Sequence, residues 1–322
     1  AGAVIFDATL HQMIIFLIML VIGAVAAKAG AIKGEAMSPL SQLITSILLP
    51  AQLFYSTYVS ATRQTICDNL VMIALAAAFY AIITAVTFLL GRALGLHGDR
   101  RRVFQLCFIF GNTGFVGMPL VSTVFPDYGL LYMSLFTLVD QLLFWTMGVY
   151  LSTAREGGSS HAPGHDPQPH RISWRTFVSP NTVSMMLVFA AVLVEVELPS
   201  IATEALGLVA NAAPAMCMIY LGAMLYFSNF STALKTPDLY VGIVAKMIVL
   251  PVIIGRLLLW CSVVPNELLE CFVIIMALPV MTLVPIIAQR NGHEGDYAAG
   301  ITVSTLAASI VTVPLVVWLT FG

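Results

Sequence analysis

The segment whose residue types most favour chemistry is GNTGFVGMPL, residues 111–120. Its three glycines and one proline lower helix propensity and remove a backbone donor, so a helix is expected to break here. A second segment, ALPVMTLVPIIAQRNG, carries two prolines six residues apart and is expected to break in the same way. Broken helices expose N–H groups and a partial positive charge at their new N-termini, which is chemistry that holds a carboxylate.

These two segments predict one binding site for a small anion. Asn112 and Thr113 are the expected side-chain donors, and Gln52 and Asn211, each close to a proline, are expected either to line the cavity or to bond a freed carbonyl. The alternative for the broken segments is a pair of packing kinks, since Gly and Pro are common in membrane helices. The predicted substrate-binding residues are Gly111, Asn112, Thr113, Gly114, Gly117, Pro119, Pro279, Thr282, Pro285, Gln52 and Asn211.

Asp140, followed by Gln141, lies in the middle of an apolar segment. Burying a carboxylate is costly unless it is paired or protonated, so these two residues are predicted to bind a coupling proton or cation. The alternative is a neutral acid that is hydrogen-bonded within the bundle. Lys246 and Arg256 lie about two turns from helix ends, and we expect their side chains to extend to the membrane interface; the alternative is contact with the substrate.

No other constellation of residues indicates chemistry. Three histidines lie in a polar stretch and are interpreted as solvated loop residues rather than metal ligands, and the five cysteines are scattered singly through apolar segments. No nucleophile with its base and no phosphate-binding loop is visible. The sequence therefore predicts no enzyme, no cofactor and no metal site. The histidines are His161, His165 and His170.

The composition indicates which elements position these residues. Of the 322 residues, 59% are hydrophobic and 9% charged, whereas soluble domains carry about 25% charged residues. The net charge of −2 offers no basic surface for nucleic acid. Each membrane span needs about 20 apolar residues, so we predict an all-α polytopic membrane protein of about ten transmembrane helices. They are expected at about 8–27, 37–60, 67–92, 102–125, 128–152, 177–197, 201–227, 238–262, 268–290 and 296–320.

The only long polar stretch divides the chain into two halves. Residues 1–152 form the first five-helix unit, residues 153–176 a linker, and residues 177–322 the second unit. Basic residues gather on the side of the linker, and only Arg63 lies in a loop on the other side, so the linker is predicted to be cytoplasmic and both termini extracytoplasmic. The basic residues on the linker side are Lys28, Lys33, Arg92, Arg100, Arg101, Arg102, Arg155, Arg171, Arg175, Lys235 and Arg290.

Five helices per half is an odd number, so two copies of one unit must be inverted relative to each other, as in many secondary transporters. Two dipeptides support such a repeat. Pro50-Ala51 is echoed by Pro214-Ala215, with an offset in residue number of 214 − 50 = 164, and Asp127-Tyr128 by Asp296-Tyr297, with an offset of 296 − 127 = 169. The interrupted helices 4 and 9 then occupy matching positions in the two repeats, which is the best sequence indication of a transport site.

Several motifs resemble the auxin efflux carrier family, the bacterial relatives of plant auxin exporters. GNTGFVGMPL resembles the family's signature in helix 4, and other segments agree in order over nearly all of the chain. These are ILLPAQLFYS, SPNTVSMMLVFAAVL, NAAPAMCMIYLGAML, ALPVMTLVPIIAQRNG and STLAASIVTVPL.

The resemblance implies two inverted five-helix repeats, with helices 4 and 9 crossing at their breaks, as in bile acid sodium symporters. It implies an elevator-like movement, small organic acid anions such as malonate, malate or auxin-like acids as substrates, and a homodimer. The segments that cross would be residues 111–119 and 279–285. Helix 9 lacks the acidic residue that helps bind sodium in the bile acid branch, so the coupling ion stays open between a proton and sodium.

The sequence thus predicts a secondary active transporter in the plasma membrane, with a bacterial inner membrane favoured. Two alternatives use the same fold: a passive channel or facilitator, and a membrane sensor that signals through the linker.

Overall fold

The computed structural model describes residues 2–152, 180–227, 233–290 and 294–322. Throughout this part the regular structure is helical, without strands, which confirms the predicted all-α class. The predicted linker and its three histidines lie outside the described residues.

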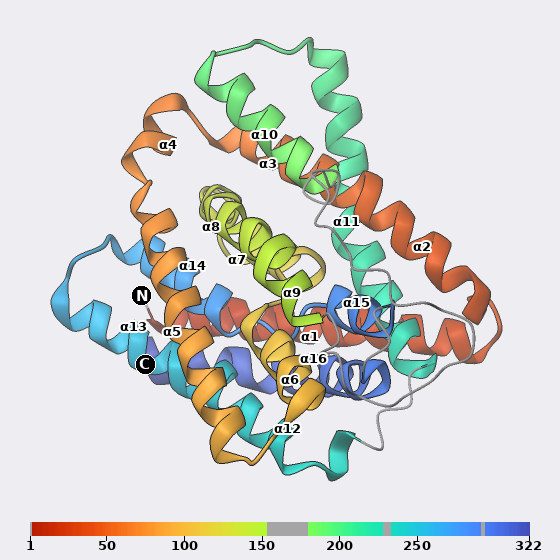
Figure 1. Cartoon of the computed structure of the whole chain (residues 1–322). Coiled ribbons are helices and arrows are strands. Elements are labelled where there is room, and N and C mark those ends of the chain that lie inside the picture. Colours follow the sequence, from red (N-terminus) through yellow and green to blue (C-terminus); the bar gives the residue numbers. More distant parts are fainter. Residues whose placement is uncertain (1, 153–179, 228–232, 291–293) are drawn as a thin grey trace.

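The first half of the chain consists of helices joined by short connections (Figure 1). α1 spans Gly2–Lys28 and is followed by the 3₁₀ turn η1, Gly34–Ala36. α2 (Met37–Leu43), η2 (Ile44–Leu48) and α3 (Leu49–Ser60) form one continuous stretch. The remaining elements are α4 (Arg63–Asp68), α5 (Val71–Ala93), α6 (Gly98–Ile109), η3 (Thr113–Gly117), α7 (Met118–Val124), α8 (Gly129–Leu143), η4 (Phe144–Gly148) and α9 (Val149–Ser152).

The second half has the same character. Its elements are α10 (Pro180–Leu193), α11 (Ser200–Phe227), η6 (Ala233–Lys235), α12 (Pro237–Gly242), η7 (Ile243–Val249), α13 (Leu250–Cys261), α14 (Asn266–Met276), α15 (Leu283–Arg290) and α16 (Gly295–Phe321). The start of α1 and the end of α16 lie on the same side of the molecule (Figure 1).

Six helical stretches of the described part are long and apolar enough to cross a membrane. They are Ala3–Lys28, Val71–Ala93, Gly129–Ser152, Ser200–Phe227, Pro237–Cys261 and Gly295–Phe321. Shorter apolar helices cover Thr113–Val124 and Val183–Leu193. A multi-pass membrane protein follows from these helices.

Prolines explain three local irregularities in the helices. The π-helical turns η2, η3 and η7 each end two residues before a proline, respectively Pro50, Pro119 and Pro251. A proline has no N–H and its ring displaces the carbonyl four residues earlier, and a widened turn accommodates that clash. These three prolines therefore widen their helices without ending them.

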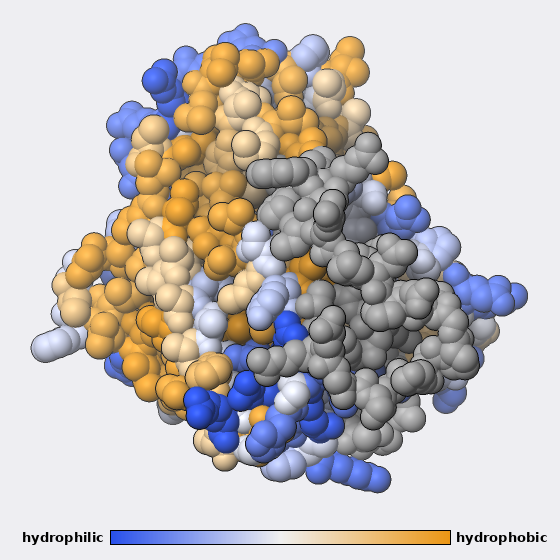
Figure 2. All heavy atoms as spheres, in the orientation of Figure 1, coloured by the Kyte–Doolittle hydropathy of each residue, from blue (hydrophilic) through white to orange (hydrophobic). Residues whose placement is uncertain are grey.

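The surface of the helices is apolar in the way that a lipid-facing surface must be. Hydrophobic spheres cover a broad area over α10, α5 and α13 in Figure 2, and hydrophilic ones gather at the lower edge, where Figure 1 places the α5–α6 connection and α12. Exposed apolar side chains include Leu89 on α5, Leu187 on α10 and Trp260 on α13. Because a soluble protein rarely exposes such a large contiguous apolar area, this surface fits a hydrocarbon environment.

Glycines allow α1 and α11 to pack with their backbones in contact. A Cβ atom built on Gly23 would lie 2.1 Å from the carbonyl oxygen of Ile219, and one built on Gly222 would lie 2.0 Å from that of Leu20. Small residues at a helix interface permit this approach, which is a common basis of association between membrane helices.

Candidate functional site

The two interrupted segments meet inside the protein. Between α6 and η3, and between α14 and α15, the chain is not helical, and Gly111 pairs there with Val280 in an isolated antiparallel bridge. The Asn112 N–H donates to the Pro279 carbonyl at 2.7 Å, and the Met281 N–H donates to the Phe110 carbonyl at 3.1 Å. Backbone groups freed by the breaks thus satisfy each other. We call residues 110–113 and 278–282 the crossover.

The pairing at the crossover carries information about symmetry. An antiparallel bridge has a local two-fold axis, and the numbers of the paired positions differ by 280 − 111 = 169. That offset equals the one between the two Asp-Tyr dipeptides, 296 − 127 = 169. If the bridge lies on the axis that relates the two halves, its two residues occupy equivalent positions in the two repeats.

Asn112 is the predicted donor that the structure places most clearly at the crossover. Its Oδ1 atom accepts from the Phe115 N–H at 3.1 Å and caps η3, which leaves the amide Nδ2 group as the free donor. Nδ2 is buried and has no hydrogen-bond partner among the described residues. The hydroxyl of Thr282 and Oε1 of Gln52 are likewise buried without such a partner. Unsatisfied buried polar atoms are rare and costly, so each of the three is a candidate ligand contact.

Asp140 is fully buried on α8 and is surrounded by donors. The Tyr80 hydroxyl donates to Oδ1, while the Thr113 hydroxyl and the Gln141 amide donate to Oδ2 at 3.3 and 3.2 Å. Thr113 therefore links this carboxyl to the crossover. Tyr80, on α5, was not predicted, because a tyrosine in an apolar segment carries no signal of a partner that lies 60 residues away in the chain.

The predicted position of Lys246 at the membrane interface is wrong. Its side chain is 1% exposed, and its Nζ atom donates to the Leu278 carbonyl at the crossover. The same Nζ atom lies 3.5 Å from the position that a Cβ on Gly111 would occupy. The widened turn η7 carries Lys246, and the break after α14 frees the Leu278 carbonyl for it. The ammonium and the Asp140 carboxylate interact electrostatically. Arg256, by contrast, is exposed, and its Nε atom donates to the Leu319 carbonyl at 2.9 Å.

The other predicted residues fall into two groups. Gly117, Pro119 and Pro279 are buried, and Gly114 and Pro285 are half-buried. A Cβ on Gly117 would lie 2.3 Å from Cε of Met133 and 2.7 Å from Cδ1 of Leu278, so any larger residue there requires these two side chains to shift. Asn211 is exposed on α11 and does not join the buried group.

A second residue that the sequence interpretation missed is Thr305 on α16. Its Oγ1 atom accepts from the Val280 N–H at 3.1 Å and donates to the Thr302 carbonyl at 2.9 Å. It anchors the second crossing segment to α16. In the described part of the chain, no group of three or more His, Cys, Asp or Glu residues is placed to hold a metal ion.

Long apolar helices that enclose two interrupted, mutually bonded segments are features of multi-pass membrane transporters. The comparison with known proteins agrees: residues 8–318 match the family described as membrane transport protein, and the chain belongs to this family, that of the auxin efflux carriers. A similar protein, described as an uncharacterized transporter, comes from Methanothermobacter thermautotrophicus. It is 22% identical over 314 residues, which cover 97% of this chain and 98% of the relative.

Proposed function

We propose that this protein is a secondary active transporter of small organic acid anions and that the anion binds at the crossover. The substrates are mono- or dicarboxylates such as malonate, malate or auxin-like acids. The observation that carries the proposal is the buried, unpartnered amide of Asn112 at a bonded crossing of two broken helices, close to the buried ammonium of Lys246.

The preference for an anion follows from the charges around the crossover. The helical stretch of η3 and α7 begins at Thr113 and α15 begins at Leu283, and helix N-termini carry a partial positive charge. The buried side chain of Lys246 adds a positive charge whenever its amine is protonated. A carboxylate between these groups would accept hydrogen bonds that no described residue now accepts, including the one from Asn112.

Asp140 is the proposed coupling group. When its carboxyl is ionised, it balances Lys246, with which it interacts electrostatically. When it is protonated, the surroundings of the crossover gain a net positive charge that favours a bound anion. Proton uptake and anion binding would then be linked without a second binding site.

A proton fits the coupling role better than sodium does. Three carbonyls at the crossover already have donors: the Phe110 carbonyl from Met281, the Pro279 carbonyl from Asn112, and the Leu278 carbonyl from Lys246. Protonated Lys246, which donates to the Leu278 carbonyl, would repel a sodium ion at these oxygens. We therefore expect transport without added sodium.

The transport cycle is proposed to be of the elevator type, with ten helices in two inverted repeats. The offset that the bridge shares with the Asp-Tyr dipeptides supports the repeat. α1 packs on α11, α11 on α3, and α3 on α10, and these four helices would form the scaffold, while the crossover and its supporting helices would move against it. We further propose a homodimer in a bacterial inner membrane, with both termini extracytoplasmic.

Counterflow in proteoliposomes tests the proposed function. Vesicles loaded with unlabelled malonate should accumulate external radiolabelled malonate transiently, because a carrier exchanges substrate across the membrane. The rate should saturate at low turnover and persist without sodium. Uptake that never exceeds equilibrium would favour a channel. A sensor would instead show no flux. Its signalling would be lost when residues 157–170, which lie outside the described part, are deleted.

A further inference from the structure

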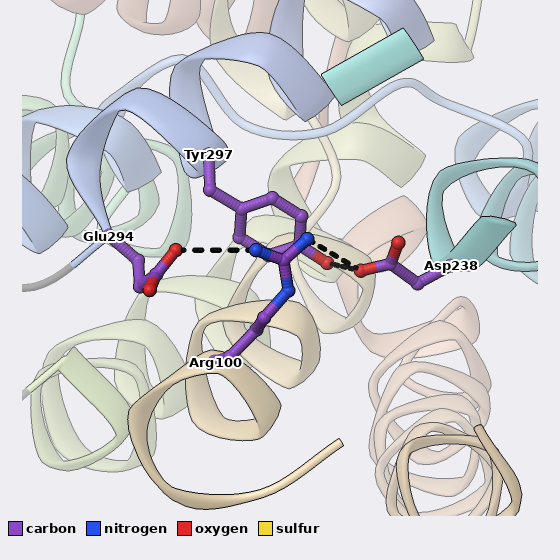
Figure 3. A network of polar contacts seen from close by, with 4 residues as sticks. All are labelled: Arg100, Asp238, Glu294 and Tyr297. Atoms are coloured by element: carbon purple, nitrogen blue, oxygen red, sulfur yellow. Dashed lines mark hydrogen bonds and ion pairs between the residues drawn. The ribbon is translucent and has the colours of Figure 1, made fainter. Parts of the chain in front are cut away.

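A charged cluster lies apart from the crossover, at the start of α6. The Arg100 guanidinium pairs with Asp238 through NH2 at 3.5 Å and with Glu294 through NH1 at 3.6 Å, as Figure 3 shows. It also lies over the Tyr297 ring, 4.0 Å from its centroid. The Tyr297 hydroxyl donates to the Asp238 carboxylate. We call these four residues the clasp.

The clasp joins the two halves of the chain. Arg100 belongs to α6, Asp238 to α12, and Glu294 and Tyr297 stand at the start of α16. Asp238 is 3% and Tyr297 7% exposed, so the carboxylate that Arg100 contacts is shielded from solvent. Exposed ion pairs contribute little, but a fork-shaped guanidinium that bridges two carboxylates and stacks on a ring is far more constrained.

α6 is also bound to the second half further along its length. Near its end, Phe108 packs so closely on α12 that a Cβ on Gly242 would lie 2.2 Å from Cζ of the ring. Just beyond it, the crossover bonds tie Phe110 and Asn112 to the second crossing segment. The clasp thus holds α6 at its start, the packing contact holds it near its end, and the crossover holds the chain just beyond it.

The clasp is absent from the equivalent positions of the other repeat. If the offset of the Gly111–Val280 bridge holds along both halves, Arg100 corresponds to Leu269, Asp238 to Asn69, Glu294 to Phe125 and Tyr297 to Tyr128. None of these four equivalents carries a charge, and Phe125 stacks on Tyr128 with ring centroids 5.4 Å apart. The repeat can therefore form without a clasp, so the clasp is a specialised feature of one end of the molecule.

We propose that the clasp of Arg100, Asp238, Glu294 and Tyr297 stays closed throughout the transport cycle and makes α6, α12 and α16 move as one body. This inference rests on the proposed transport function. Arg100 is a positioning residue: it acts on the crossover through α6 rather than by touching the substrate. At the opposite end, where a stack of aromatic rings replaces the clasp, the helices are free to separate more easily.

Substitutions at Arg100 test its contribution. Arg100→Gln should shift the folded-to-unfolded ratio by about fivefold and should lower malonate uptake. Arg100→Lys should restore only part of the stability and part of the malonate uptake, because the single nitrogen of an ammonium cannot pair with two carboxylates as the separate nitrogens of a guanidinium do. Arg92→Gln is the matched control: Arg92 also lies over a ring, that of Phe88, at 5.6 Å, but makes no ion pair within the described residues.

A cross-link distinguishes a permanent clasp from a gate that opens in each cycle. Arg100→Cys and Glu294→Cys are combined in a chain whose exposed cysteines, Cys67 and Cys261, are replaced by serine. Both new thiols are accessible, since the native side chains are 36% and 39% exposed. Joining them with a short bifunctional maleimide should restore the malonate uptake that the two substitutions remove. Uptake that falls further on cross-linking would overturn the proposal, and so would an Arg100→Gln variant identical to the wild type.

Hydrogen exchange separates the failure of this proposal from failure of the transport assignment. Arg100→Gln should speed exchange in 237–242 and 295–302, and Arg92→Gln should not. If the wild type takes up no malonate, the substrate assignment fails, whereas faster exchange in Arg100→Gln would still support the clasp. Unchanged exchange in both variants would refute it whatever the substrate.

Discussion

At the scale of single residues, the protein keeps two opposite charges buried around one backbone crossing. Lys246 and Asp140 are 1% and 0% exposed, and each has hydrogen-bonding partners, Leu278 for the lysine and Tyr80 and Thr113 for the aspartate. Buried charges are costly unless they are paired, so both side chains are candidates for a functional role.

The two buried charges should be energetically coupled. Lys246→Met and Asp140→Asn should each lower the free energy of unfolding. The double variant should lose about 1 kcal/mol less than the sum of the two single losses, because neither charge is then left buried without the other. Chemical unfolding in detergent measures the cycle. Strictly additive effects would show that the two charges do not interact.

Tyr80 should hold the Asp140 carboxyl in position. Tyr80→Phe removes the phenol donor and should cost about 2 kcal/mol, since a hydrogen bond to a carboxylate is stronger than a neutral one. Tyr226→Phe is the control, because Tyr226 is half exposed. Equal melting temperatures for the two variants would contradict the role assigned to Tyr80.

The proposed coupling role of Asp140 has its own test. In Asp140→Asn, anion uptake should lose its dependence on pH, because the amide cannot take up or release a proton. Uptake is measured across the pH range in vesicles without a membrane potential. A variant that keeps the wild-type pH profile would exclude Asp140 as the coupling group.

At the scale of the elements, local residue types predicted the breaks and the family resemblance implied that they cross, but neither predicted the bonds between them. Gly111 and Pro279 stand where the helices are interrupted, because propensity is a local property. That the two breaks bond to each other, and that Lys246 donates to one of them, depends on packing between distant segments. The expectation for Lys246 failed because its position near a helix end said nothing about which way its helix faces.

The contact between α1 and α11 should tolerate no added side chain. Gly222→Ala should cost about 2 kcal/mol, since the new methyl group would press on the backbone carbonyl of Leu20 and not on a movable side chain. Gly34→Ala is the control, because nothing lies within 4 Å of a Cβ there. Melting temperatures in detergent compare them. Equal values would show that the two helices can separate at little cost.

At the scale of the whole molecule, the composition predicted a membrane protein, and the basic residues in the loops predicted its orientation. Two exposed cysteines can test that orientation. Cys67 and Cys261 both lie on the side predicted to be extracytoplasmic. A membrane-impermeant maleimide should label both in intact cells, whereas a cysteine introduced at Gly34 should react only after permeabilisation. The reverse pattern would invert the proposed topology.

The proposed repeat leaves only a faint signal in the sequence, because inverted halves would share a backbone path and few side chains. The Asp-Tyr pair has an offset of 296 − 127 = 169, which the bridge between Gly111 and Val280 shares, whereas the Pro-Ala pair has an offset of 214 − 50 = 164. Most of the side chains around the crossover have no equivalent of the same type, so pattern matching could not assign the site.

Anion binding at the crossover is the central claim, and thermal stabilisation of the purified protein tests it most directly. A panel of mono- and dicarboxylates is added with and without sodium. A ligand at 100 times its dissociation constant should stabilise the folded state by about 2.7 kcal/mol. We predict a shift with at least one acid, independent of sodium and lost in Asn112→Ala and Lys246→Met. No shift with any acid, or a shift that both variants retain, would contradict an anion site at the crossover.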